Sequence, residues 1–183
     1  MGRLISFIAC LLIAAPCAFA QYAPQISIES VPDFFQLPQG MNFGEVSAIA
    51  VNSQGHVFVF HRSSPSGGGP AYGIHAAQLF EFDASGRYQR ELGRGLYAWS
   101  FAHGVRIDSN DNIWTVDKGS NMVVRMDPAG RVVWVFGRKT ESVSEEARPF
   151  EHVDTPRPRA DGRFREPTDV AFDSAGNIYI TDG

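Results

Sequence analysis

Two residues of the sequence, His103 and Arg62, stand where they could do chemistry. His103 opens one copy of a repeated pattern, and the other two copies open with Ser47 and Thr168. An imidazole at that position could bind a divalent metal ion, or it could be a hydrogen-bonded structural residue at the start of a strand. Arg62 follows His61 at the end of the first copy, where a guanidinium could hold a carboxylate or stabilise developing negative charge. The structural alternative for this arginine is a simple pairing with a nearby carboxylate.

The elements that must position these residues are three copies of one pattern, at 47–61, 103–117 and 168–182. Apolar side chains alternate with others on both sides of a polar turn, which is typical of a β-hairpin with one preferred face. Asn or Asp is expected to bond its own backbone before the turn, and a residue that tolerates positive φ is expected within it. The aligned sets are Ile49, Val105 and Val170, then Asn52, Asp108 and Asp173, then Gly55, Asp111 and Gly176.

A second hairpin pattern is interleaved with the first, because 79–93 matches 123–137 without a gap. One inner and one outer hairpin make a four-stranded antiparallel sheet, which is one blade of a β-propeller. The order of the patterns predicts an all-β propeller, of which 46–183 supplies about two and a half blades. Since such a stack cannot close a ring, we expect a longer protein. Residues 21–45 are a lead-in that could supply a ring-closing strand, with 26–30 as the candidate segment.

The last residue of each copy also differs in an informative way. The second and third copies end in Asp117 and Asp182, whereas the first copy ends in His61. A carboxylate at a strand end can accept hydrogen bonds from nearby backbone amides, so we expect both aspartates to be structural caps. The change to His61 and Arg62 breaks this rule, and function is expected where a repeat is broken.

Residues 1–20 predict a secretory signal, because Arg3 precedes an apolar run and Ala-Phe-Ala comes before Gln21. Both cysteines, Cys10 and Cys17, lie within it, so the mature chain would have no disulfide. The net charge of −4 argues against a nucleic-acid partner. We therefore expect a secreted or periplasmic protein that is free of the membrane after signal cleavage, with its oligomeric state left open.

Three further side chains have weaker interpretations. His56 occupies a turn position and is predicted to be solvated. Tyr97 and Trp99 come just before His103, where they could wall a pocket or, as we favour, pack in the core.

Three segments, VSAIAVNSQGHVFVFHR, FAHGVRIDSNDNIWTVD and FREPTDVAFDSAGNIYITDG, carry a resemblance to a known family. They resemble NHL-repeat propellers, and among these they look most like the peptidyl-α-hydroxyglycine α-amidating lyases. The resemblance covers nearly all of 44–183 outside the loops. The F-x-x-P-T-D-V-A motif is shared across NHL repeats, whereas V-F-H-R and F-x-H-G are more specific to the lyases. The resemblance implies a six-bladed β-propeller.

The resemblance also implies a set of site residues. His103 matches the first of three histidines that bind a catalytic zinc, and Arg62 matches a catalytic arginine. Ile49 and Val105 match positions whose backbone carbonyls bind a structural calcium. The other two histidines, a calcium aspartate and a catalytic tyrosine would lie beyond the end of this chain. Arg165 stands where animal members have a cysteine, so their disulfide is absent here.

The implied activity is zinc-dependent cleavage of the C–N bond of peptidyl-α-hydroxyglycine, which gives a peptide amide and glyoxylate. The substrate would be a peptide or a small molecule, and this chain alone is expected to be inactive. The alternative is a non-catalytic NHL-repeat propeller that binds a protein, peptide or sugar ligand, because fold does not fix function. A tyrosine directly after Gly183 would favour the lyase. Other propeller hydrolases use carboxylates and asparagine around a divalent ion, and no such set is seen in this sequence.

Overall fold

The computed structural model describes residues 24–62, 77–139 and 161–183, and all of their regular secondary structure is β-strand. The chain divides into two units, Met1–Pro32 and Asp33–Gly183. The described part of the first unit has no strand, and Ile26 and Ile28 in the candidate ring-closing segment are exposed. The predicted signal at 1–20 lies outside the described residues. In the part of the chain that is described, no helix is long and apolar enough to span a membrane.

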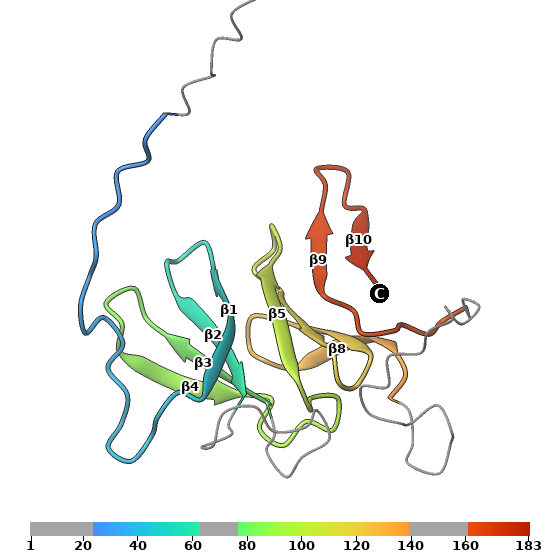
Figure 1. Ribbon diagram of the computed structural model, residues 1–183, viewed down its shortest axis with the longest axis horizontal. Coiled ribbons are helices and arrows are strands. Elements are labelled where there is room, and N and C mark those ends of the chain that lie inside the picture. Colours follow the sequence, from blue (N-terminus) through green and yellow to red (C-terminus); the bar gives the residue numbers. More distant parts are fainter. Residues whose placement is uncertain (1–23, 63–76, 140–160) are drawn as a thin grey trace, which may run out of the picture. The chain divides into compact units, whose positions relative to one another are not determined.

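Antiparallel strands follow the predicted alternation of inner and outer hairpins (Figure 1). The first sheet contains β1 (Glu45–Val51), β2 (Val57–Arg62), β3 (Ala77–Phe82) and β4 (Tyr88–Leu92) in that order. The second contains β5 (Ala102–Ile107), β6 (Ile113–Asp117), β7 (Met122–Met126) and β8 (Val132–Gly137). A third hairpin pairs β9 (Asp169–Phe172) with β10 (Ile178–Thr181). An all-β fold of four-stranded, propeller-like sheets is therefore confirmed, while six blades stay a prediction.

The register of the inner hairpins confirms the alignment of the three copies. The last pairs before the turns are Val51 with Val57, Ile107 with Ile113, and Phe172 with Ile178. In the second copy Asp108 Oδ1 accepts hydrogen bonds from the amides of Asn110 and Asn112, at 2.9 and 3.0 Å. The turn residues Gly55, Asp111 and Gly176 have φ values of 80°, 59° and 83°, so the predicted turn chemistry is present in every copy.

The sheets of the second unit pack on one another through apolar side chains. Strand β5 contacts β1 and β2 on one side and β9 on the other, so the strand that carries His103 lies between neighbouring sheets. Burial of these apolar faces supplies most of the stabilisation of the stack. The first interface contains Phe58, Phe60, Leu79, Val105, Ile113, Val124 and Met126, and the second contains Trp114, Val116, Val123 and Val170.

The segment before β1 covers the other face of the first sheet. Phe34, Phe35 and Phe43 pack on a cluster that includes Phe80 and Phe82. The Gln36 amide donates to the Gly86 carbonyl at 2.8 Å, in an isolated bridge beside the turn that leads into β4. This part of the predicted lead-in therefore shields an apolar sheet face without forming a strand of its own.

The His56 side chain is 28% exposed and contacts a buried carboxylate, so it is less solvated than the sequence predicts. Its Nδ1 lies 2.7 Å from Oε1 of Glu81, a residue that is only 5% exposed. The other carboxylate oxygen accepts a hydrogen bond from Arg90 Nε at 2.6 Å. Arg90 also donates to the carbonyls of Pro128 and Ala129, so this network joins the first sheet to a turn of the second. A buried carboxylate needs such donors, because an unpaired charge in the interior is costly.

Candidate functional site

His103 lies at a break in the regular pairing of β5 with β6. It is the extra residue of a β-bulge between Ala102 and Gly104. Ser47, its counterpart in the first copy, is the extra residue of an equivalent bulge in β1. A bulge redirects a side chain from the face that the strand alternation would give it, and bulges are common beside active sites. The repeat therefore offers an irregular position at the start of the inner strand, and the second copy places an imidazole there.

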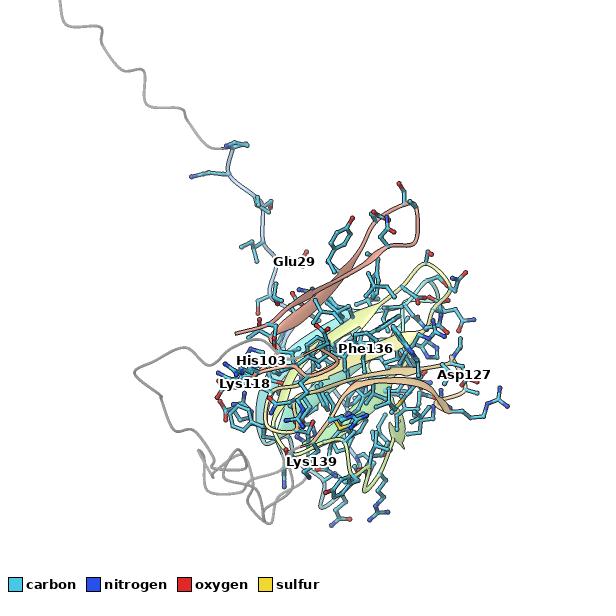
Figure 2. All side chains as sticks on the ribbon, turned by 90° about the vertical axis from the view of Figure 1, so that its right-hand side faces the viewer. Glu29, His103, Lys118, Asp127, Phe136 and Lys139 are labelled. Atoms are coloured by element: carbon cyan, nitrogen blue, oxygen red, sulfur yellow. The ribbon has the colours of Figure 1, made fainter. Side chains whose placement is uncertain are left out.

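The surroundings of His103 favour a neutral imidazole. Burial lowers its pKa, and the positive charges of Lys118 and Arg62 lower it further, whereas Asp169 and Asp117 oppose the shift. His103 and Lys118 are labelled in Figure 2. The Nδ1 atom of His103 is buried, and among the residues that the structure describes it has no hydrogen-bond partner. A neutral imidazole with an uncommitted nitrogen is the form that binds a metal ion, so the residue suits a ligand role.

Arg62 reaches from the end of β2 to the residues that precede His103. Its Nε donates to the carbonyl of Ala102 at 3.0 Å, and its guanidinium carbon lies 3.6 Å from the centre of the Phe101 ring. Its Nη1 lies 2.6 Å from Oε1 of Glu45, at the start of β1. The side chain is 17% exposed. Arg62 thus has the carboxylate partner that the structural alternative expects, and it also lies beside the candidate metal ligand.

The carboxylate of Asp117 holds the loop that leads into β5. It accepts hydrogen bonds from the amides of Ser100, Phe101 and Ser120 at 2.9, 2.8 and 2.8 Å. Burial raises the pKa of Asp117 because it disfavours the charged form, and the hydrogen bonds from these amides oppose that rise. The prediction that this aspartate is a structural cap is confirmed.

The other two copies have a cap at the same position. Asp182 accepts a hydrogen bond from the Arg165 amide at 2.6 Å, as the sequence predicts. In the first copy His61 Nδ1 accepts the Gly44 amide at 3.2 Å. His61 therefore replaces the aspartate as the acceptor at this strand end, and its presence beside Arg62 has a structural cause.

A second ion pair next to His103 was not found by reasoning from the sequence. The Lys118 amide donates to the Phe101 carbonyl at 3.1 Å, and its Nζ lies 2.9 Å from Oε2 of Glu166. The Glu166 amide donates to Oδ1 of Asn121 at 2.7 Å. Glu166 and Asn121 have φ values of 53° and 59°, a left-handed conformation that non-glycine residues seldom adopt. Residues from two loops that lie far apart in the sequence therefore meet here, and no local motif indicated it.

The predicted metal ligands are only partly assembled by the described residues. Ile49 and Val105 lie at equivalent places on β1 and β5, two strands that pack against each other. Among residues 24–62, 77–139 and 161–183, no group of three or more His, Cys, Asp or Glu side chains could hold a metal ion. His103 is thus one zinc donor that fits by its chemistry, and zinc and calcium stay predictions.

The two aromatic residues before His103 have different environments. Trp99 is 4% exposed, and its Nε1 donates to Thr115 Oγ1 at 3.0 Å. The interpretation of Trp99 as a core residue is confirmed. Tyr97 is 61% exposed, and the Lys139 ammonium lies 4.1 Å from the centre of its ring. Tyr97 is therefore a surface residue, and core packing was the wrong expectation for it.

The fold and the site define an all-β protein of propeller-like sheets with an arginine and a histidine at adjoining strand ends. Comparisons place this chain near one group of enzymes. A Caenorhabditis elegans protein named "Probable peptidyl-alpha-hydroxyglycine alpha-amidating lyase pgal-1" is 29% identical over 154 residues, which are 76% of this chain and 39% of the relative. Peptidylglycine alpha-amidating monooxygenase of Rattus norvegicus is 25% identical over 176 residues, 83% of this chain and 15% of the relative.

Among solved structures, a streptogramin B lyase aligns with a TM-score of 0.49 and 15% identity, over 78% of this chain and 36% of that one. No family model matches the chain. The chain thus resembles the amidating lyases in sequence, and it spans less than half the length of the two relatives named above.

Proposed function

We propose that the protein to which this chain belongs is a lyase that cleaves the C–N bond of a peptide ending in α-hydroxyglycine. The products would be the peptide amide and glyoxylate. The observation that carries this proposal is the placement of Arg62 against the two residues that precede His103, in a chain whose relative is named as such a lyase. The predicted signal at 1–20 adds that the enzyme is secreted or periplasmic.

The residues of this chain would share the work as follows. His103 would be one of the ligands of a zinc ion, which when bound acts as a Lewis acid and lowers the pKa of an oxygen that it holds. The burial that lowers the pKa of His103 favours the neutral imidazole, in which one of the two ring nitrogens carries no proton. Arg62, held by Glu45 and the Ala102 carbonyl, would bind the substrate carboxylate or the negative charge that develops as the bond breaks. The backbone carbonyls of Ile49 and Val105 would hold a structural calcium.

A second candidate function is ligand binding without catalysis. It is favoured by one observation, the ion pair between Arg62 and Glu45, which already neutralises the arginine. In that case the strand ends around His103 would hold a peptide, protein or sugar ligand, and no bond would break. The two candidates differ in what happens to a hydroxyglycine peptide after it binds.

The test is to incubate the intact protein with a peptide that ends in α-hydroxyglycine and to measure the release of glyoxylate. We expect turnover in the wild type, and a loss of at least about 100-fold in Arg62→Ala and His103→Ala. The metal content of each variant is measured in parallel. His103→Ala should lose zinc, whereas His56→Ala, at the far end of a neighbouring hairpin, should retain it. Stable binding of the peptide with no glyoxylate would replace this proposal with the second candidate.

A further inference from the structure

The backbone just before and at the start of β5 is held by groups from both neighbouring strand ends. Asp117, at the end of β6, accepts the amides of Ser100 and Phe101. The Phe101 carbonyl accepts the Lys118 amide, and the Ala102 carbonyl accepts Arg62 Nε. These hydrogen bonds fix the backbone of the segment. They therefore also fix the positions of the residues that contact it or follow it along the chain.

The positions of both candidate functional residues, Arg62 and His103, depend on this segment. In the described part of the chain the Arg62 guanidinium contacts Glu45, the Phe101 ring and the Ala102 carbonyl, and the last two belong to this segment. His103 is the next residue along the chain and lies in the bulge that the segment enters. A displacement of the Phe101 backbone would therefore move both the arginine and the imidazole.

We propose that Asp117 is a positioning residue, whose buried carboxylate fixes the Phe101 backbone and thereby sets Arg62 and His103 in their relative places. Its effect on turnover rests on the proposed function, whereas its effect on the Arg62 side chain does not. A buried carboxylate is costly unless donors satisfy it, and here the donors are the amides of the segment being held. The amides of the loop therefore stabilise the carboxylate, and the carboxylate in turn fixes the conformation of the loop.

The variant that tests this is Asp117→Asn, which keeps the size of the side chain and one carbonyl oxygen but loses the second acceptor. The matched control is Asp108→Asn, at the opposite end of the same hairpin. Its carboxylate also accepts several hydrogen bonds, from the amides of Asn110 and Asn112 and from Trp114 Nε1. Each variant removes a carboxylate that accepts backbone hydrogen bonds, at one or the other end of the β5–β6 hairpin. Of the two carboxylates, only that of Asp117 contacts the segment that holds Arg62.

The first readout is hydrogen exchange of the Arg62 Nε–H, followed by nitrogen-15 NMR of the intact protein. Asp117→Asn should speed this exchange by about tenfold or more, because the bond to the Ala102 carbonyl opens more often. Asp108→Asn should leave it within about twofold of the wild type. Equal exchange in the wild type and Asp117→Asn would overturn the proposal. If Asp117→Asn does not fold, Asp117→Glu is measured in its place, and the same ranking is expected.

The second readout is turnover, measured in two backgrounds. Asp117→Asn should lower kcat/KM by about 10-fold to 100-fold with little change in KM, because it misplaces groups without removing them. In an Arg62→Ala background the same change should lower kcat/KM by a smaller factor, because only its effect through His103 remains. Equal losses in both backgrounds would overturn the proposal. If the wild type shows no turnover, the proposed function fails, and the exchange measurement alone decides the role of Asp117.

Discussion

The guanidinium carbon of Arg62 lies 3.6 Å from the centre of the Phe101 ring, so a strand end of the first sheet is fastened to the start of the second. The stacking brings together two parts of the chain that belong to different copies of the repeat. It also explains how a side chain with a carboxylate partner at Glu45 can lie next to His103. This stacking and other features of the fold can be tested without knowing the substrate.

The stacking of Arg62 on Phe101 should appear as a coupling free energy. Phe101→Leu keeps an apolar side chain but removes the ring, and Arg62→Lys keeps the charge but removes the planar guanidinium. In a double-mutant cycle measured by urea unfolding, we expect a coupling of about 0.5–1 kcal/mol. A cycle of Arg131→Lys with Phe101→Leu serves as the control and should be additive, because Arg131 pairs with Asp127 in the turn between β7 and β8. Additivity in the first cycle would show that the stacking contributes nothing to stability.

His61 should make the protein less stable in mild acid. Its side chain is fully buried against the rings of Phe43 and Phe80, and its Nδ1 accepts the Gly44 amide. Burial lowers the pKa of His61 below its ordinary value of 6.5, although a backbone hydrogen bond at Arg62 and the charge of Glu91 oppose the shift. The unfolded state therefore binds a proton more readily than the folded state. The contribution of His61 to the free energy of unfolding is complete above pH 6.5 and is lost as the pH falls toward the folded-state pKa.

The variant His61→Asn isolates this effect, because asparagine can accept the Gly44 amide but does not titrate. The free energy of unfolding is measured by urea denaturation from pH 7.5 to pH 5. The difference between wild type and variant should change by up to about 1.4 kcal/mol per pH unit below the ordinary histidine range. A constant difference across this range would contradict the prediction. His103, whose pKa is also lowered, is present in both proteins and cancels in the comparison.

Asp173, at the turn of the third copy, should titrate far below an ordinary aspartate. Hydrogen bonds from the Asn177 side chain and amide and from the Tyr179 hydroxyl lower its pKa to about 2. Its stabilising effect should therefore be present above pH 3.8 and disappear as the pH falls toward 2. Carboxyl carbon NMR gives the midpoint directly. Tyr179→Phe removes one donor and should raise the midpoint toward 3.8, and an unchanged midpoint would exclude the tyrosine as a cause.

Phe60 should be among the most costly residues to truncate. Its side chain is fully buried between the first two sheets, with its ring centre 5.1 Å from that of Trp99. Phe60→Ala is expected to lower the free energy of unfolding by about 3–5 kcal/mol, through lost apolar burial and the cavity left behind. Val51→Ala, at a position that is 56% exposed, should cost less than about 1 kcal/mol. Urea unfolding followed by tryptophan fluorescence measures both, and similar losses would show that this interface is not a packed core.

The hairpins could be predicted from the sequence because their rules are local. The spacing of apolar residues sets the strand faces, and a turn such as that at Asp108 uses donors only two and four residues away. The aspartate caps followed from the same reasoning, since Asp117 bonds the amide of Ser120 three residues on. The family resemblance added the candidate roles of Arg62 and His103, and these roles still require the experiments above.

Contacts between distant segments could not be predicted in this way. His56 was expected in solvent, yet it pairs with Glu81 from another strand, and Lys118 pairs with Glu166 from a loop far along the chain. The cover that Phe34 and Phe43 provide over the first sheet is of the same kind. Each of these contacts depends on how two elements that are distant in the sequence pack against each other.

The sequence by itself determined the strands, their turns and the order of hairpins, because periodicity and turn chemistry act over a few residues. Only the tertiary structure decided that the Arg62 guanidinium lies on Phe101, that His103 occupies a bulge, and that Asp117 holds the backbone between them. The physical reason is that side-chain placement at a strand end depends on the adjoining sheet, and close packing of two sheets has no local signature in either.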